Sequence, residues 1–334
     1  MLKNSIAAAL LAAAFVTAPA AAETWRIEKD GELRTLGEGE QDLYVQAVAR
    51  IKQLVSQGQC LEADRSAEQL KKDYPEVNAA DFAAFMKSEM LFCEGRFEEA
   101  AAAYEKFLTD YPKSRLYEAA LDRQFAIATA YLSGRGKKVF KIFRVSSHAE
   151  GENIMNRIAD RAGDSPISAK AAAAVAESFE KRGDFTQAYE KWSQIHARWP
   201  TGLTGRRALL GMARCKHASY AGPDYDSSGL VSAGSYYEQF ARRYSRRAEE
   251  LEVAEKLDLI SEQTAYKQFT IGRYYDENGN LQSANLYYQM VLDRWPDSTA
   301  AKMAAAAVEN QRTRQERQKT WLDKISSKLG NLFL

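Results

Sequence analysis

Cysteine, histidine and proline are scarce in this sequence, whose 334 residues include three, three and seven of them. Three cysteines are too few, and odd in number, to indicate a disulfide framework. We interpret Cys60, Cys93 and Cys215 as small buried side chains of helices, in preference to a Cys60–Cys93 bridge. The histidines are isolated and no two cysteines have zinc-ligand spacing, so we expect no metal and no other cofactor.

An excess of one charge is also missing, since 46 Lys and Arg residues face 45 Asp and Glu residues. A balanced chain does not attract nucleic acid through its overall charge, so we expect no nucleic-acid partner. No metalloprotease motif, complete phosphate loop or other catalytic constellation is present either. We therefore expect a protein that is not an enzyme.

The first 22 residues have the pattern of a secretory signal peptide. Lys3 provides a positive start, an apolar stretch of 11 residues runs from Ile6 to Val16, and three alanines precede Glu23. A membrane anchor needs about 20 apolar residues, which neither this stretch nor any later one provides. We expect export, with a mature chain that begins near Glu23. No cysteine directly follows the apolar stretch, so a bacterial lipoprotein's acylation site is missing.

One spacing of residues recurs along the chain. A small anchor residue is followed by large apolar residues four and seven positions later, and often by an aromatic residue and proline at eleven and twelve. A glycine commonly stands five positions before the anchor. The second, fourth and sixth copies are full, the first and fifth are weaker, and the third is degenerate. The six anchors are Ala63, Ala100, Gly151, Ala188, Ala233 and Ala284.

Offsets of four and seven place the large side chains on one face of a helix, above the small anchor. Glycine suits the turn before this helix, and proline stops it. Each copy is therefore predicted to be the second helix of a helical hairpin, whose apolar face the next hairpin covers. We predict an all-α solenoid of five to six hairpins over residues 41–310.

This pattern resembles the tetratricopeptide repeat. The last copy matches it best, through Gly272, Tyr275, Ala284, Tyr288 and Pro296. The resemblance implies stacked helical hairpins that present a binding groove.

Two segments flank the predicted solenoid. Residues 23–40 alternate apolar residues around a Lys-Asp-Gly turn, which indicates a small β-hairpin or an ordered loop. Residues 311–334 form the end of a long predicted helix, which either caps the final repeat or lies on a membrane surface or a partner. The apolar residues of this tail, at helical spacing among lysines, are Trp321, Leu322, Ile325, Leu329, Leu332 and Phe333.

Two short stretches resemble ligand-binding loops only in part. GRGKK at 134–138 lacks the spacing of a phosphate loop and the Ser or Thr after its lysine, so we interpret it as a loop between helices. DYDSSG at 224–229 begins like a calcium loop, but position twelve is Ser235 instead of a bidentate Glu. We interpret this stretch as a turn.

Two groups of side chains are candidates for partner binding. One is an arginine cluster that is either a solvated helix end or a docking patch for an acidic partner or anionic head groups. Its members are Arg242, Arg243, Arg246 and Arg247. The other group comes from three pairs of adjacent tyrosines, in which one ring should fill the core and the other line a groove. The groove candidates are Tyr236, Tyr274 and Tyr287.

Longer stretches resemble the BamD/ComL family over roughly residues 42 to 310. They are EEAAAAYEKFLTDYPKSRLYEAA, GRGKKVFKIF and IGRYYDENGNLQSANLYYQMVLDRWPDSTAA. Members of this family are periplasm-facing outer-membrane lipoproteins of the β-barrel assembly machinery. The resemblance implies a scaffold that binds the barrel-forming subunit and extended segments of incoming outer-membrane proteins. Members are usually anchored through a lipidated cysteine, and this signal lacks one.

We therefore expect an exported, periplasmic repeat scaffold without enzymatic activity, peripheral to the outer membrane. Its expected partners are an outer-membrane assembly subunit and extended peptide segments, with the amphipathic tail as a replacement for the lipid anchor. The alternative is a soluble periplasmic repeat protein that coordinates Tol-Pal or cell-wall machinery through the same kind of binding.

Overall fold

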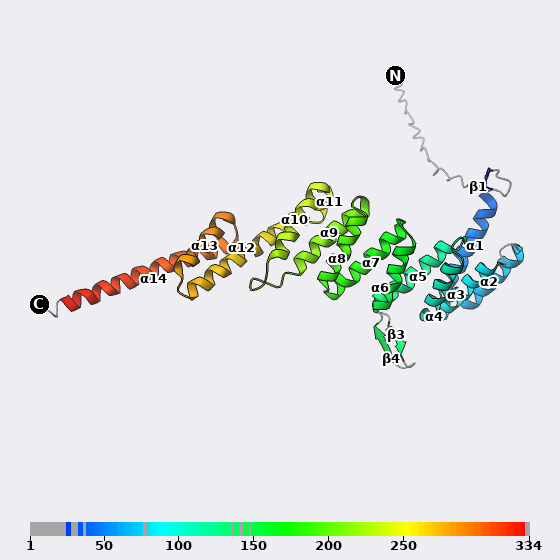
Figure 1. Cartoon of the computed structure of the whole chain (residues 1–334), viewed down its shortest axis with the longest axis horizontal. Helices are drawn as coiled ribbons and strands as arrows, with labels where there is room; N and C mark the ends of the chain where they lie inside the picture. Colours follow the sequence, from blue (N-terminus) through cyan, green and yellow to red (C-terminus); the bar gives the residue numbers. More distant parts are fainter. Residues whose placement is uncertain are drawn as a thin grey trace, which may run out of the picture. The chain divides into compact units, whose positions relative to one another are not determined.

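The computed structural model describes residues 25–27, 33–35, 38–75, 79–134, 136–139, 143–146 and 148–330. Within these ranges it contains 14 helices and four short strands (Figure 1). The predicted signal peptide, residues 1–22, lies outside the described residues, as do Leu332 and Phe333 of the predicted tail.

Twelve of the helices alternate as the first and second members of six hairpins. The first helices are α1 (Glu38–Ser56), α3 (Ala80–Cys93), α5 (Tyr117–Leu132), α7 (Pro166–Arg182), α9 (Gly202–Ala218) and α12 (Val253–Glu277). The second helices are α2 (Cys60–Asp73), α4 (Phe97–Asp110), α6 (His148–Arg161), α8 (Phe185–Arg198), α10 (Ser228–Arg243) and α13 (Leu281–Arg294). A short helix, α11 (Ser245–Glu250), precedes α12, and the long helix α14 (Thr299–Gly330) follows α13. The all-α repeat fold predicted from the sequence is confirmed.

The six anchors lie where the spacing places them, within the first two turns of the six second helices. All are buried, as are the residues four and seven positions after each anchor. The degenerate third copy belongs to the series: a Cβ on Gly151 would come within 2.9 Å of the carbonyl oxygen of Ala128 on α5. Glycine at this anchor lets two helices approach closely, so the higher repeat number is correct.

Glycine and aromatic residues define the ends of the second helices. Gly58, Gly95, Gly183 and Gly279 precede α2, α4, α8 and α13 with φ between 73° and 80°, a left-handed conformation that favours glycine. At the other end, the amide of Trp199 donates to the carbonyl of Ile195 at 2.8 Å, and Pro200 follows. Proline cannot continue the helix, as the sequence predicted.

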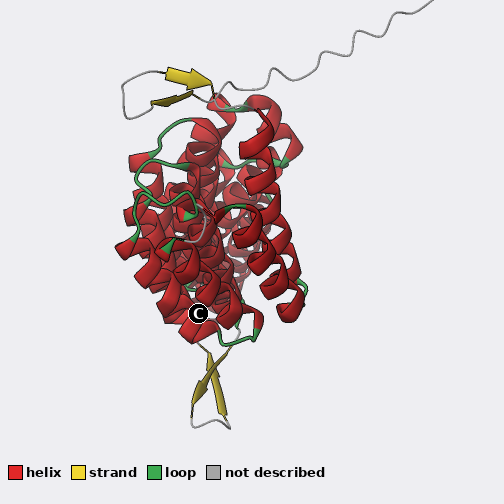
Figure 2. Cartoon of the chain, turned by 90° about the vertical axis from the view of Figure 1, so that its right-hand side faces the viewer, coloured by secondary structure: helices red, strands yellow, loops and turns green. Residues whose placement is uncertain are grey.

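The described strands form two antiparallel hairpins (Figure 2). β1 (Trp25–Ile27) pairs with β2 (Leu33–Thr35), within the segment for which the sequence indicates a small β-hairpin or an ordered loop. β3 (Gly136–Val139) pairs with β4 (Phe143–Ser146) between α5 and α6. The interpretation of residues 134–138 as a plain loop was therefore wrong. The valines and phenylalanines that follow the lysines of GRGKK favour strands.

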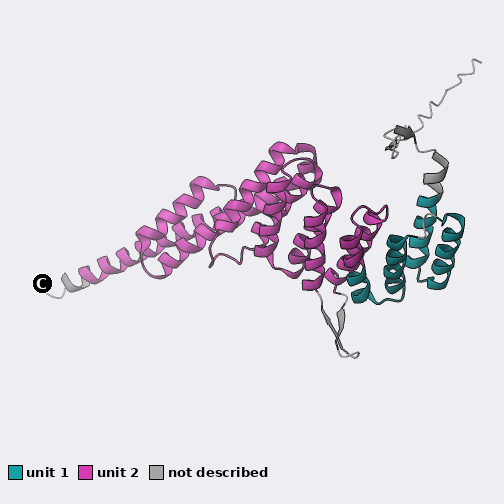
Figure 3. Ribbon diagram, turned by 45° about the vertical axis from the view of Figure 1, so that its right-hand side comes forward, with its two compact units in different colours: residues 1–103 teal, residues 104–334 magenta. Residues whose placement is uncertain are grey.

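The chain divides into two compact units, residues 1–103 and 104–334 (Figure 3). In the second unit, helices that follow one another in sequence pack against each other, from α5 to α14. The core of this unit therefore continues from hairpin to hairpin, as in other repeat proteins. One buried cluster joins α9, α10, α11 and α12, and another joins α12, α13 and α14.

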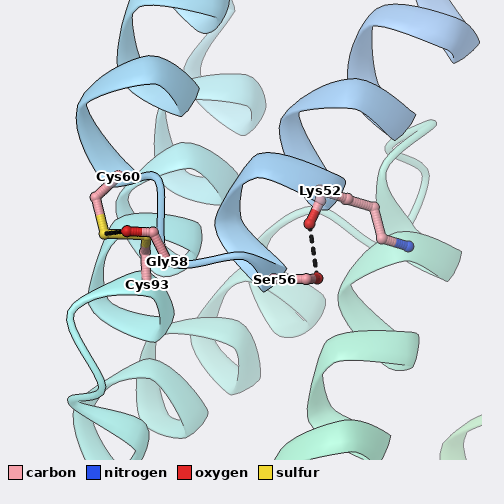
Figure 4. The surroundings of a disulfide bond; sticks show 5 residues. All are labelled: Lys52, Ser56, Gly58, Cys60 and Cys93. Carbon is pink, nitrogen blue, oxygen red and sulfur yellow. Dashed lines mark hydrogen bonds between the residues drawn. A yellow bond between two sulfur atoms is a disulfide. The ribbon is translucent and has the colours of Figure 1, made fainter.

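In the first unit, a disulfide joins Cys60 at the start of α2 to Cys93 at the end of α3 (Figure 4). Their Cα atoms are 5.7 Å apart, although 33 positions separate them in sequence. The prediction that these two cysteines are unpaired was wrong. It was based on their number, whereas the decisive fact is that the fold brings these two helix ends together. Cys215 is buried and unpaired, as predicted.

Candidate interaction surface

The paired tyrosines divide between the core and the surface of the second unit. Tyr237 and Tyr288 are almost fully buried, whereas their neighbours Tyr236 and Tyr287 are half-buried. In the third pair Tyr274 is 62% exposed, while its neighbour packs against the last core cluster. Each pair thus has one ring inside and one nearer the surface.

Tyr236 belongs to a cluster that joins three helices. Its hydroxyl lies 2.7 Å from the hydroxyl of Tyr189 on α8, and Lys216 Nζ on α9 lies 4.1 Å from the centre of the Tyr189 ring. Burial, together with the hydrogen bond to Tyr189, raises the pKa of Tyr236 to about 12. This cluster ties α8, α9 and α10 together, so Tyr236 is more a structural contact than an open groove residue.

Tyr274 and Tyr287 belong to one aromatic cluster at the last hairpin. The ring of Tyr275 stacks on Tyr287 with 5.7 Å between centroids, and Tyr274 meets Tyr275 edge-on at the same distance. The structure thus brings two of the three predicted groove tyrosines together through a third ring. Because Tyr274 is held by ring contacts and remains exposed, it offers a rigid aromatic surface to a partner.

A series of polar contacts links the first helices α7, α9 and α12. Arg207 and Arg214 on α9 pair with Glu177 and Glu180 on α7, and Arg214 Nη2 lies 2.9 and 3.0 Å from the two oxygens of Glu180. The next link joins His217 of α9 to Gln263 of α12, with Nε2 3.0 Å from Oε1. We call this series the first-helix ladder.

The first-helix ladder was not predicted from the sequence. Its pairs are 30, 34 and 46 positions apart, so no local motif contains both partners. Opposite charges on successive predicted first helices were the available signal. Trp192 of α8 also donates its indole N–H to Glu180, which connects the ladder to the core. Burial raises the pKa of the neighbouring Cys215 thiol to about 12, so this thiol stays protonated.

Beside the ladder, a hollow of about 350 Å³ lies against the connection between α9 and α10. Its lining residues are Lys216, Ser219, Tyr220, Ala221, Tyr225, Asp226, Ser228 and Gly229. The DYDSSG stretch begins as a turn, as predicted, and runs into the first residues of α10, where Asp226 accepts the amide of Ser228 at 3.2 Å. Lys267 Nζ of α12 donates to the carbonyls of Pro223 and Tyr225 at 2.5 and 2.8 Å. These two carbonyl oxygens are therefore already hydrogen-bonded to the ammonium group of Lys267.

The four arginines of the predicted patch lie at the end of α10 and on α11. Arg242 pairs with Glu238 at 3.5 Å, and Arg246 and Arg247 both pair with Glu250, at 3.4 and 2.6 Å. The fourth, Arg243, donates to the carbonyl of Pro200 at 3.2 Å. Three of the four arginines thus share two glutamates three or four positions away, which balance half of the patch's charge, and exposed pairs of this kind contribute little stability.

The long helix α14 has two parts. Its first turns cap the last hairpin, with Ala300, Ala301 and Ala304 buried in the final core cluster. Further along, Trp321 and Leu322 are 60% and 51% exposed, and Ile325 is half-buried. The side chain of Leu329, another apolar residue of the predicted tail, is not among the side chains that the structure describes. The helix is therefore a cap at its start and has an exposed extension.

Within the described part of the chain, no group of three or more His, Cys, Asp or Glu side chains is arranged to hold a metal ion. None of the helices that the structure describes is both long and apolar enough to cross a membrane.

Comparison with known proteins supports the repeat assignment. Residues 83–114 and 268–298 match the tetratricopeptide repeat family, so the chain contains repeats of this type. Such repeats typically serve as non-enzymatic scaffolds for protein–protein interaction. No curated protein matches the chain.

Three solved structures are similar to this chain at low identity. A tetratricopeptide repeat protein from Parabacteroides merdae is 14% identical, with 79% of this chain and 98% of that one covered and a TM-score of 0.31. The C-terminal part of a repeat protein from Cytophaga hutchinsonii is 13% identical, with 77% and 98% covered and a TM-score of 0.22. A human IFIT1 dimer with m7Gppp-AAAA is 15% identical, with 80% and 72% covered and a TM-score of 0.25. No functional argument rests on these similarities.

Proposed function

We propose that this protein is an exported, non-enzymatic tetratricopeptide scaffold of the outer-membrane β-barrel assembly machinery. It binds the barrel-forming subunit or extended segments of unfolded outer-membrane proteins. The observation that carries the binding role is the first-helix ladder, a series of fixed polar pairs that runs from α7 through α9 to Gln263 on α12, with Lys267 one turn further along that helix. Tyr274 extends the aromatic surface on α12.

A fixed surface of this kind suits an extended chain. The ladder pairs and the stacked tyrosines are ordered before a partner arrives, so binding orders few additional side chains. An extended outer-membrane segment alternates apolar and polar side chains, so it presents apolar side chains that can pack on an aromatic ring. Because it is extended, its backbone N–H and C=O groups are also open to hydrogen bonds. The apolar side chains of such a segment can pack on the exposed ring of Tyr274. Its backbone groups can form hydrogen bonds with the polar side chains of α9 and α12.

Two observations support an exported location. The first residues have the composition of a signal peptide. The Cys60–Cys93 disulfide belongs to a class of bond that persists in oxidising compartments and is rare in the reducing cytosol. Both features fit the periplasm, where the assembly machinery meets its substrates.

Photo-crosslinking in the cell envelope tests the proposal. A photoreactive residue replaces Tyr274 on α12, and the matched control replaces Leu286 on α13, which is exposed to nearly the same degree, 64% against 62%. We expect position 274 to capture a barrel-assembly subunit or an outer-membrane protein, and position 286 to capture neither.

Two results would contradict this function. Equal capture from both positions would mean that the first-helix face has no special role. Capture of Tol-Pal or cell-wall components from position 274 would replace the barrel-assembly role with the alternative, while the repeat scaffold would remain.

A further inference from the structure

The contacts that hold α14 to the repeats end well before the helix does. Gln311 is 3% exposed, and Arg314 Nη2 lies 3.0 Å from each carboxylate oxygen of Asp276 on α12. From 315 to 326 every side chain is exposed except the half-buried Ile325. The helix nevertheless continues to Gly330. We call residues 315–330 of this helix the tail.

The side of α14 that caps the repeats is continued by the apolar residues of the tail. Ile325 follows Ala307, a residue packed on the last core cluster, by 18 positions, which is about five helical turns. Leu322 follows the buried Ala300 by 22 positions, or about six turns. Both therefore lie on the capping side of the helix, at a level where the described residues provide no hairpin to cover them.

The charges of the tail indicate which surface covers this side. The tail contains four basic residues and two acidic ones; these are Arg317, Lys319, Lys324 and Lys328, and Glu316 and Asp323. A helix with an apolar side and flanking lysines, and with tryptophan among its apolar residues, is typical of helices that lie at the surface of an anionic membrane. Its long lysine side chains can reach the head groups while the apolar side enters the lipid.

We propose that the tail binds an anionic lipid surface and holds the protein peripherally at a membrane. Trp321, Leu322 and Ile325 enter the boundary between head groups and acyl chains, and the lysines contact lipid phosphates. The tail lies on the membrane and does not span it, since no described helix is apolar enough to cross. Attachment would confine the repeat surface to the membrane plane.

A second copy of the chain fits the tail less well. A coiled coil needs an apolar stripe over about three to four heptads, and the apolar residues from 321 to 329 cover fewer than two. The lysines beside the stripe would also repel those of an identical helix. An anionic lipid surface can take up a short apolar stripe, and it attracts the lysines beside that stripe.

Vesicle flotation of the full mature chain tests this proposal. One set of vesicles contains phosphatidylcholine alone, and the other contains equal parts of phosphatidylcholine and phosphatidylglycerol. We expect binding to the anionic set only, weakened by added salt because screening reduces the attraction of the lysines. The double variant Trp321→Ser with Leu322→Ser should reduce binding by about tenfold or more, because two apolar side chains no longer enter the lipid.

The matched control changes two other exposed apolar residues of α14. Met303 and Val308 are 37% and 36% exposed but lie before the tail. The double variant Met303→Ser with Val308→Ser should bind anionic vesicles like the unaltered protein. Circular dichroism should show unchanged helix content in both double variants.

Three results would overturn the proposal. They are no binding to anionic vesicles at low salt, equal binding by the tail variant, and a concentration-dependent dimer that the tail variant abolishes. The last would assign the tail to a second copy. Crosslinking from position 274 does not depend on the tail, so its outcome and that of the flotation experiment are separable.

Discussion

Gly211 of α9 lies directly against the indole ring of Trp192 on α8. A Cβ at position 211 would come within 2.6 Å of three ring atoms, closer than side chains approach each other. Trp192 is the large residue four positions after the anchor Ala188, and it is fully buried. The absence of a side chain at 211 is therefore what allows the largest repeat residue to fit between two successive hairpins.

Replacing Gly211 by alanine should destabilise the second unit. The added methyl group has to displace the ring of Trp192, and overpacking of this kind costs about 1–3 kcal/mol. The free energy of unfolding in urea measures the effect. Gly234→Ala is the control, because its Cβ would have 3.8 Å of space and alanine favours a helix. A stability gain in both variants would show that the contact with Trp192 is not tight.

Removal of the disulfide should weaken the first unit. The double variant Cys60→Ser with Cys93→Ser frees the unfolded chain from the crosslink and so raises its conformational entropy. For a loop of this size the expected loss in the free energy of unfolding is about 3–4 kcal/mol. Unfolding in urea with and without reductant measures it, since reduced unaltered protein should behave like the double variant. Thiol titration of the unfolded, unreduced protein should give one thiol, from Cys215. Three thiols would contradict the bond.

The attachment of α14 should depend on Glu262. Its carboxylate on α12 accepts the amides of Thr299 and Ala300 at 3.0 and 3.2 Å, which caps the first turn of α14. Glu262→Ala should cost about 1–2 kcal/mol and speed hydrogen exchange at those amides, because capping groups satisfy otherwise unpaired donors. Glu309→Gln, which removes only an exposed pair with Arg312, should change little. Unchanged exchange in Glu262→Ala would exclude the capping role.

Stability should fall at alkaline pH through buried tyrosines. Burial raises the pKa of Tyr237 from an ordinary value of 10 to about 12. The folded state thus keeps the phenol proton more tightly than the unfolded state, so this contribution is complete below about pH 10 and is lost as pH rises towards 12. Tyr237→Phe should flatten that decline in urea unfolding, whereas Tyr225→Phe, at an exposed position, should not. An identical decline in both variants would contradict this assignment.

The features predicted correctly from the sequence are those encoded by local spacing. Ala63 and Ala284 could be placed in the core because offsets of four and seven define one helix face. The Cys60–Cys93 bond and the Glu180–Arg214 pair could not be placed this way, because each joins residues brought together by the packing of successive helices. The pairing of Arg246 and Arg247 with Glu250, by contrast, lies within a single turn of one helix, so local spacing could have predicted it.

Packing between successive helices has a consequence for how the second unit melts. Because its core contacts join neighbours along the chain, each hairpin depends mainly on the two beside it, and partial unfolding can begin at an end while the middle stays folded. A change at the Gly211–Trp192 contact should therefore combine additively with one at the Gly272–Tyr288 contact, since they belong to different helix pairs. Cooperativity in this protein is a property of adjacent hairpins, and its range along the chain is set by the weakest junction between them.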